Sequence, residues 1–367
     1  MINLVCLSPN GQCRIDLAAP PSGVVVGTMD GVAVVERDPL AASWNVSHSQ
    51  LRGKHVSSLL IEADSGSIFA GFHDGGIFFS RDRGVKWERR ANGLRHQHVF
   101  SLASTERNGR RLIYAGTEPV SLYRSENLGL SWEEFPAINK VSGTDKWSFP
   151  APPHLAHTKS LAIDPRNPDA IYAAIEQGAL LFTKDGGANW QELDAYYDES
   201  EPVYRDIHRV VIAERNPEEM YMTSGMGLYH SFDGGCSWEK LTGRDFAIGY
   251  PDHFTISPFD DSVLYLAGAR TNPGAWRQSH TAEATILRSD DKGRTWRTAN
   301  HGLDVNGANI EAMSLAVYPG GFSIIIGTTD GKVYCSDNGG DSWSLIATGL
   351  APISKGGHAL NLRMPAS

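Results

Sequence analysis

Cysteine is scarce in this sequence, and clusters of positive charge and long apolar runs are missing. The four cysteines, Cys6, Cys13, Cys236 and Cys335, have neither the spacing of a zinc site nor that of a disulfide framework. The net charge is −9 and no basic run occurs, which makes nucleic acid and anionic membranes poor partners. No segment is long and apolar enough to span a bilayer.

The first residues of the chain also lack the basic region and apolar run of a signal peptide. We therefore expect a soluble cytoplasmic protein. Hydrophobic residues make up 41% of the 367 residues, which is enough to bury a large core. Because the sequence is repetitive throughout, we expect a single domain over residues 1–367 rather than two or three.

What the sequence does contain is a short motif that recurs along almost its whole length. The motif reads Ser/Thr-x-Asp/Asn-x-Gly-x-x-Trp, and its copies are 43 to 58 residues apart. A repeat of roughly 40–50 residues with strand-like content is typical of a β-propeller. Six clear copies end at Trp87, Trp132, Trp190, Trp238, Trp296 and Trp343, and a worn copy ends at Trp44.

One repeat shows the predicted blade in full. Residues 160–164, 170–174 and 179–183 read as strands separated by turns, and a fourth strand follows the motif at 190–193. Four antiparallel strands for each motif, numbered from the axis outward, make one blade. The sequence thus predicts an all-β fold, a seven-bladed β-propeller with four-stranded antiparallel blades.

The motif resembles the Asp-box, or BNR repeat, of sialidase-like propellers in the WD40/YVTN/BNR-like group. Its Asp or Asn is expected to accept hydrogen bonds from the amides of its own turn, and its Gly to take a positive φ. These roles are structural, so the motif indicates the fold and not the function. Sialidases bind a sugar carboxylate with three arginines, and no aligned channel position holds an arginine, although Tyr250 and Glu311 leave a Tyr–Glu pair open.

Aligning the repeats on their innermost strand reveals a column of histidines. His-x-x-Ser-Leu recurs at His55, His98 and His157, and His358 begins a related stretch near the chain end. The innermost strands line the central channel, so these positions should form a ring at one wide, wet mouth. Asp206, Tyr250 and Glu311 occupy the equivalent positions of the other blades.

Converging imidazoles with carboxylates beside them favour a metal site. Neutral imidazole is a common ligand of transition metals, and a carboxylate can ligate or fix a histidine tautomer. We expect His55, His98, His157 and His358 to bind a divalent Fe, Mn or Zn ion. The arrangement is similar in geometry alone to carotenoid-cleavage oxygenases and to propeller polysaccharide lyases. Drift of a duplicated motif is the alternative origin of the column.

Three functions remain open for such a ring. The first is a metal-dependent hydrolase or lyase acting on a small organic or sugar-derived substrate, with Tyr250, Glu311 and Asp206 as acid–base groups. The second is an oxygenase-like enzyme with histidine-bound iron. The third is a binding or assembly scaffold, as in propellers that resemble the photosystem-assembly or sortilin-like families. A further alternative is metal-free catalysis, with a ring histidine as base and Tyr250 or Glu311 as acid.

The closure of the ring has two readings. If residues 358–364 form the innermost strand of the first blade, His358 joins the ring and residues 1–19 are an added hairpin that turns at Asn10-Gly11. If residues 13–17 form that strand instead, Cys13 lies near the ring. The first reading is preferred, because His358 follows Trp343 by the same 15 residues that separate Glu311 from Trp296.

The unusual loops, at 137–156, 194–205 and 269–283, are predicted to gather over the same mouth. Long loops over one channel mouth indicate a substrate pocket. Their aromatic and arginine content suits an oxygen-bearing organic substrate. The expected substrate contacts are His73, Trp147, Tyr197, Arg270, Trp276, Arg277 and His280.

Overall fold

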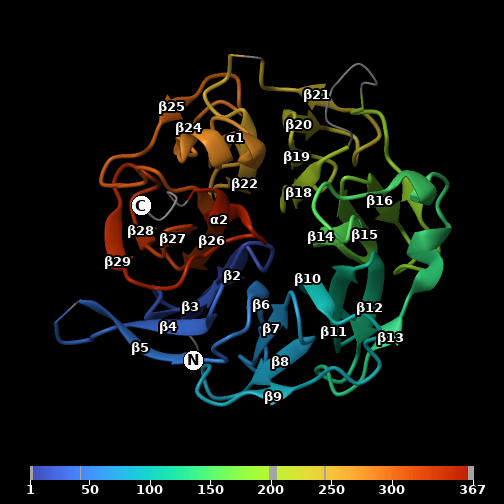
Figure 1. The fold of residues 1–367 in the computed structure, drawn as a ribbon, viewed down its shortest axis with the longest axis horizontal. Coiled ribbons are helices and arrows are strands. Elements are labelled where there is room, and N and C mark those ends of the chain that lie inside the picture. Colours follow the sequence, from blue (N-terminus) through green and yellow to red (C-terminus); the bar gives the residue numbers. More distant parts are fainter. Residues whose placement is uncertain (1–2, 42, 198–204, 244, 363–367) are drawn as a thin grey trace.

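The computed structural model describes residues 3–41, 43–197, 205–243 and 245–362. Their strands form seven sheets arranged around an axis, which confirms the predicted seven-bladed β-propeller (Figure 1). Among these residues, no helix has both the length and the apolar character needed to cross a membrane.

Five blades follow one plan, in which four consecutive antiparallel strands run outward from the axis. The second and third blades comprise β6 (Val56–Ile61), β7 (Ile68–Phe72), β8 (Ile77–Ser80), β9 (Glu88–Arg89), and β10 (His98–Arg107), β11 (Arg110–Glu118), β12 (Ser121–Ser125), β13 (Glu133–Glu134). The fourth blade comprises β14 (His157–Asp164), β15 (Asn167–Glu176), β16 (Ala179–Thr183) and β17 (Gln191–Glu192). The fifth comprises β18 (Ile207–Ile212), β19 (Met220–Ser224), β20 (Gly227–Ser231) and β21 (Glu239–Lys240). The sixth comprises β22 (Tyr250–Ile256), β23 (Leu264–Ala269), β24 (Thr285–Ser289) and β25 (Arg297–Thr298).

The first and last blades depart from this plan because the N-terminal segment enters both. The first blade has the order β1 (Leu4–Leu7), β3 (Gly23–Thr28), β4 (Gly31–Arg37), β5 (Trp44–Gln50), and β1 runs parallel to β3. The last blade contains β26 (Ile310–Tyr318), β27 (Gly321–Thr328), β28 (Val333–Ser336) and β29 (Ser344–Ala347). A fifth strand, β2 (Arg14–Asp16), pairs in parallel with β26 on its inner side (Figure 1).

Both predictions for the innermost strand of the first blade are therefore wrong, because β1 occupies that position. Residues 3–19 do reverse direction, but the arms β1 and β2 lie in different blades and do not pair with each other. The C-terminal stretch is not a strand. It forms the short helix α2 (His358–Asn361), and residues 363 and 364 lie outside the described part of the chain. Cys13 leads into β2, where its carbonyl accepts a hydrogen bond from the amide of Leu315.

Between β1 and β2, residues 8–13 cross the central channel; we call this stretch the N-terminal crossing. On one side, the amide of Asn10 donates to the Ser57 carbonyl (3.0 Å) and that of Gln12 to the Leu59 carbonyl (2.9 Å), both in β6. On the other side, the Arg209 guanidinium of β18 donates to the Pro9 carbonyl (2.9 Å). The crossing thus divides the channel into two halves.

The recurring motif has the local structure that its residues predict. In the fourth blade, Asp185 Oδ1 accepts from the amide of Asn189 (2.9 Å) and the hydroxyl of Thr183 (2.8 Å). Glycine is found at φ 100° at Gly187, and all six motif glycines have a positive φ. The residue before the motif glycine also has a positive φ in all six copies. This explains why glycine occupies that position in three of them, as Gly186 does in the fourth blade.

The motif tryptophans divide into two groups. Four donate their indole N–H to the carbonyl of their own motif glycine, as Trp190 does to Gly187 (3.1 Å). Trp132 and Trp343 instead reach the neighbouring blade and donate to Arg90 and Ala299. The apolar core is likewise shared between adjacent blades, and Tyr265 of β23 packs in one cluster with residues of β26 and β27.

The first strands of six blades carry a β-bulge at the same place. The pairing register shifts between Val56 and Ser58 in β6, and at the corresponding step of β10, β14, β18, β22 and β26. A bulge leaves one residue unpaired and redirects its side chain. The bulged residues are Ser57, Phe100, Lys159, His208, Asp252 and Glu311.

The bulge corrects the alignment of the last blade. In five blades the bulged residue lies two positions after the predicted ring residue, as Ser57 follows His55. In β26 the bulged residue is Glu311 itself, so the equivalent of His55 is Asn309. The alignment placed Glu311 two residues out of register, because spacing to the motif tryptophan does not register a bulge.

The N-terminal crossing can be tested at Gly11. A Cβ atom there would lie 2.3 Å from Ser8 Oγ and 2.4 Å from the Leu59 carbonyl oxygen. We expect Gly11→Ala to lower the free energy of unfolding by about 1–3 kcal/mol through overpacking. Gly243→Ala is the control, because its Cβ would meet no atom within 4 Å. Equal stabilities of both variants in urea unfolding would contradict the crossing.

The motif carboxylate should contribute stability that depends on pH. Hydrogen bonds from Asn189 and Thr183 lower the pKa of Asp185 to about 2, against about 3.9 in the unfolded chain. Its contribution is therefore complete above the unfolded pKa and is lost as the pH falls through about 2. We expect Asp185→Ala to lower the Tm at pH 7 relative to Lys184→Ala, and this difference to vanish near pH 2. A difference that persists unchanged at pH 2 would argue against the ionised cap.

Candidate functional site

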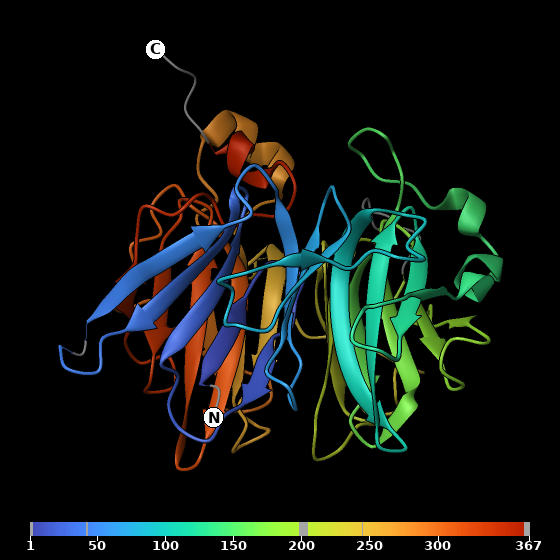
Figure 2. The same cartoon turned by 90° about the horizontal axis from the view of Figure 1, so that it is seen from below.

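The ring of first-strand residues lies at the end of the blades where the helices gather. Figure 2 shows α1 (Pro273–Ser279) and α2 together over this end of the strands. Two short 3-10 helices, η1 (Pro136–Lys140) and η2 (Thr144–Lys146), belong to the 137–156 segment. The helices and loops cover the ring, so the expected wide and wet mouth is not present: His157 is 1% exposed and Glu311 is 0% exposed.

His157 is held between two carboxylates. Its Nε2 lies 2.5 Å from Glu176 Oε2 and its Nδ1 lies 3.3 Å from Glu118 Oε2. Burial favours the neutral imidazole, but these two carboxylates outweigh it and raise the pKa of His157. The ring of Phe100 stacks on the imidazole at 3.7 Å. The buried Lys159 ammonium bonds the other oxygen of Glu176.

Glu176 is ionised in this environment. Burial alone would raise its pKa, but the Lys159 ammonium and His157 hold the pKa of Glu176 well below its usual range. The carboxylate is therefore fixed as an anion with a defined position, at the end of β15 where it faces the channel.

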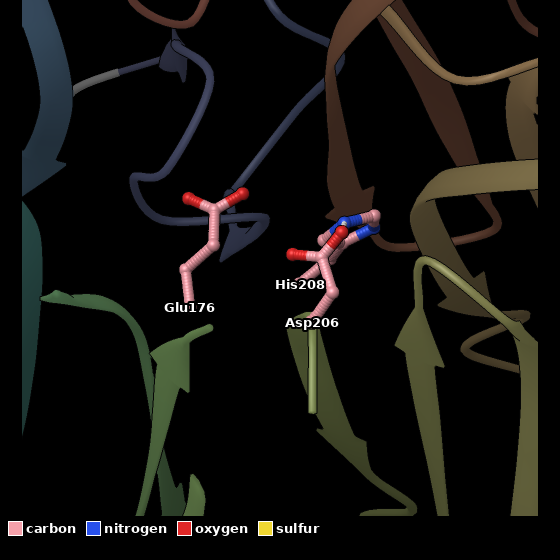
Figure 3. A group of neighbouring side chains, drawn as sticks. All are labelled: Glu176, Asp206 and His208. Carbon is pink, nitrogen blue, oxygen red and sulfur yellow. Dashed lines mark ion pairs between the residues drawn. The ribbon is translucent and has the colours of Figure 1, made fainter. Parts of the chain in front are cut away.

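Asp206 and His208 stand next to Glu176 on the first strand of the following blade. The side chains of all three are buried, and one ligand atom from each lies within 4.8 Å of the others (Figure 3). Asp206 Oδ2 is 3.4 Å from His208 Nε2. We call these three residues the Glu–Asp–His triad.

The tautomer of His208 follows from its hydrogen bond. Its Nδ1 lies 2.6 Å from the carbonyl oxygen of Pro251, and a carbonyl oxygen can only accept, so Nδ1 carries the proton. In a neutral imidazole Nε2 is then a bare acceptor, and it has no hydrogen-bond partner although it is buried. This lone pair faces the carboxylate oxygens of Asp206 and Glu176, an arrangement that a cation between them would stabilise.

A second acidic group lies beyond His208. Asp252, the bulged residue of β22, is ion-paired with the Lys355 ammonium. Burial alone would raise the pKa of Asp252, but Lys355 and the histidines around it hold that pKa low. Tyr250 is 6% exposed with its ring 4.6 Å from the ring of His208, and burial together with Asp206 raises the pKa of Tyr250 well above its usual range.

Glu311 binds the C-terminal segment to the ring. Its Oε2 accepts from the amide of Lys355 (2.7 Å) and the hydroxyl of Ser354 (3.0 Å), and its Oε1 accepts from Asn309 Nδ2 (3.1 Å). His358 Nδ1 lies 2.9 Å from Glu311 Oε1, so His358 does reach the ring, although it does so from α2. Burial opposes the charged imidazole, but Glu311 raises the pKa of His358.

The remaining predicted histidines lie at the edge of this network. His55 Nε2 lies 2.8 Å from the Ser354 carbonyl, and its ring is 4.4 Å from that of His73. Burial lowers the pKa of both, that of His73 to well below its usual range. His98 is exposed, with Nδ1 3.5 Å from Glu118 Oε1. The four expected metal ligands thus each contact protein partners, and His55, His157 and His358 each bond a different one.

Most of the residues expected to contact a substrate lie outside the Glu–Asp–His triad. Trp276 is fully buried, donates to the Thr271 carbonyl and packs edge-on against His358. Trp147 covers Gly178 and packs on the core of the fourth blade, and Tyr197 lies under the Arg205 guanidinium beside the core of the fifth. Three more lie around α1: Arg270 pairs with Glu283, Arg277 donates to Asn361, and His280 ends the helix. Residues 198–204 of the second loop lie outside the described chain.

The sequence alignment on the first residue of each innermost strand missed half of the charged residues that meet at the ring. Lys159, His208 and Asp252 are bulged residues, two positions after the aligned column. Glu118 and Glu176 end second strands, and in both cases a glutamate stands where that strand returns to the ring face. These repeated glutamates were the available sequence signal. Lys355 gave no such signal, because its place depends on the path of the C-terminal segment.

No protein-family model matches the chain. It is 26% identical over 257 residues to a xyloglucanase of Paenibacillus sp, an alignment that covers 66% of this chain and 20% of that enzyme. It is 24% identical over 252 residues to a xyloglucanase of Hypocrea jecorina, covering 64% of this chain and 24% of that enzyme. The chain thus matches about a fifth to a quarter of the length of these curated relatives.

Solved structures agree with the fold. An ancestral GH74 enzyme superposes with a TM-score of 0.59 at 21% identity, over 79% of this chain and 38% of that one. A GH74 enzyme of Niastella koreensis gives 0.60 at 15% identity, over 93% and 55%. YCF48 of Cyanidioschyzon merolae gives 0.50 at 14% identity, over 81% and 87%. At such identities the likeness establishes a propeller and nothing further.

The curated relatives bear on the three functions that the sequence left open. They are hydrolases named for a sugar polymer, whereas the sequence suggested a small molecule or a sugar derivative. Neither the lyase nor the oxygenase alternative has a counterpart among them. Metal dependence is not part of what their names describe.

The buried ion pair of Lys355 offers a test of the network. Lys355→Met would leave the Asp252 carboxylate buried without its cation, and we expect a loss of about 3–5 kcal/mol in the free energy of unfolding. The double variant Lys355→Met/Asp252→Asn removes both charges and should recover much of that loss. Chemical denaturation of the two variants measures the difference. A double variant no more stable than Lys355→Met would show that the pair does not interact as described.

Proposed function

We propose that this protein is a hydrolase that acts on a saccharide at the ring face, with a divalent ion bound by the Glu–Asp–His triad. One observation carries the proposal. His208 donates its Nδ1 proton to a backbone carbonyl and directs a bare, buried Nε2 at two carboxylates. Histidines that bind metal ions characteristically donate their other ring N–H in this way, which fixes the tautomer and the ring orientation.

The ligand types narrow the choice of ion. One imidazole and two carboxylates suit Zn²⁺ or Mn²⁺, and three protein ligands leave a position for water. Such an ion would supply a nucleophilic water at neutral pH and polarise a substrate oxygen. Fe²⁺ is compatible with the same ligand types, but hydrolysis does not require a redox metal. This site differs from the set of four histidines predicted from the sequence. Of those four, His157 contacts the triad through Glu176.

The surrounding residues have defined tasks in this proposal. Lys159 and His157 keep Glu176 ionised and in place. The Tyr250 phenol, protonated and against the His208 ring, is the candidate donor of a proton to the leaving oxygen. Asp206 completes the ligand set from the residue two before His208.

The saccharide assignment rests on the xyloglucanase relatives and on no contact in the structure. The burial of the triad limits the form of saccharide that can reach it. Each member of the triad is exposed by 6% or less, beneath the segments that cover the ring. A long polymer cannot lie flat against such a site, so an oligosaccharide or a chain end suits it better than the interior of a polysaccharide.

The test starts from protein treated with a chelator. Isothermal titration with Zn²⁺ and Mn²⁺ should show about one ion bound with wild type and none with His208→Ala. Hydrolysis of xyloglucan oligosaccharides, followed as new reducing ends, should fall by at least about 100-fold in the same variant. His230→Ala is the matched control, since His230 is also a buried histidine of the fifth blade beside a carboxylate, Glu219.

The possible results separate the parts of the proposal. If wild type binds neither ion, the metal site is wrong. Ion binding without hydrolysis of any oligosaccharide would refute the substrate class instead. Should His208→Ala fail to fold, Asp206→Asn removes a ligand charge at nearly constant volume and gives the same readout.

A further inference from the structure

A cavity lies in the channel on the far side of the N-terminal crossing. Its volume is about 450 Å³. Residues of six first strands, β6, β10, β14, β18, β22 and β26, form its wall, and Gln12 and Cys13 of the crossing line it as well. Pro165 and Pro258, in turns between first and second strands, also line it, so it opens at the face opposite the ring. The crossing separates this cavity from the Glu–Asp–His triad.

A buried arginine without a counter-ion lines this cavity. Arg209 is 7% exposed, and among the described residues no carboxylate lies within 4.0 Å of its guanidinium. One of its terminal nitrogens donates to the Pro9 carbonyl, while its Nε–H is buried and has no acceptor. Other arginines of low exposure differ in this respect: Arg90 pairs with Glu88, and Arg14 pairs with Glu214.

A second unsatisfied donor lines the same cavity. Ser160 of β14 is 4% exposed, and its hydroxyl has no hydrogen-bond partner. Of the two equivalent hydroxyls, that of Ser101 donates to the Thr158 carbonyl at 2.8 Å, whereas that of Ser58 is unpaired like that of Ser160. An unpaired buried hydroxyl costs about 1–3 kcal/mol, and an unpaired buried charge costs more.

We propose that this cavity binds a small organic anion, whose carboxylate or phosphate group is held by Arg209 and Ser160. An anion would neutralise the guanidinium charge, and a planar guanidinium matches either group with two parallel hydrogen bonds. The volume accommodates a molecule up to about the size of a disaccharide. Thr255, which also lines the cavity, is available to the uncharged part of the ligand.

The charged residues at the opening pair with one another. Arg14 pairs with Glu214 at 2.9 Å and with Asp16 at 3.3 Å, and Arg215 pairs with Asp261 at 3.4 Å. The uncompensated positive charge therefore lies deep in the cavity and not at its mouth. A ligand is selected by the acidic group that it carries inward, and a neutral molecule of the same size lacks that group.

The experiment compares anions with a neutral analogue in buffer of low chloride. The probes are glucuronate for the carboxylate, glucose 6-phosphate and inorganic phosphate for the phosphate, and glucose as the neutral analogue. Thermal shift and isothermal titration should show that at least one anion binds while glucose does not. The class of anion that binds identifies the acidic group.

Variants then locate the site. Arg209→Met should weaken binding of that anion at least tenfold, and Ser160→Ala should weaken it several-fold. Arg215→Met, which removes a paired arginine at the opening, is the control and should retain binding. Without ligand, Arg209→Met should unfold at the same Tm as wild type or a higher one, because it removes an unpaired buried charge.

Two results would overturn the proposal. One is that no anion binds wild type at millimolar concentration. The other is that Arg209→Met binds as wild type does, or unfolds at a markedly lower Tm, which would make Arg209 a support of the N-terminal crossing through Pro9 alone. If Arg209→Met does not fold, Arg209→Lys keeps the charge without the planar fork and should also bind more weakly.

Discussion

A β-bulge near the start of the first strands determines which side chains meet at the channel axis. Each bulge leaves one residue outside the ladder, so a blade delivers two side chains to the same end of the channel, such as Asp206 together with His208. The charged network, with its lysines and histidines, is built on this repeated irregularity.

The recurring motif made the fold predictable because its physics is local. The carboxylate, the two positive-φ positions and the indole all act within eight residues, so each copy specifies a turn regardless of its surroundings. The N-terminal strands could not be predicted in this way. The parallel pairing of Leu4 with Gly23, and of Arg14 with Leu315, depends on contacts between blades that no local pattern encodes.

For the site, the alignment predicted that several first-strand residues meet at one end of the channel, but not which partners each side chain contacts. His157, Asp206 and Tyr250 do converge there, because a first-strand start is a fixed place in a propeller. Whether a histidine pairs with a carboxylate or remains free for an ion depends on its neighbours across blades and on what covers it. Lys355 and Phe149 come from segments whose paths spacing does not predict, and they keep Asp252 and His157 away from water.

The division of the N-terminal segment between two blades also affects how the chain is made. The partner of Arg14 is Leu315, about 300 residues later, and ribosomes add about 5–20 residues per second. For roughly 15–60 s of synthesis, therefore, β2 has no β26 to pair with, while five complete blades form behind it. The propeller can close only when its last blade captures β2, one of the first strands to leave the ribosome. Completion of the seven-bladed ring is thus a late event.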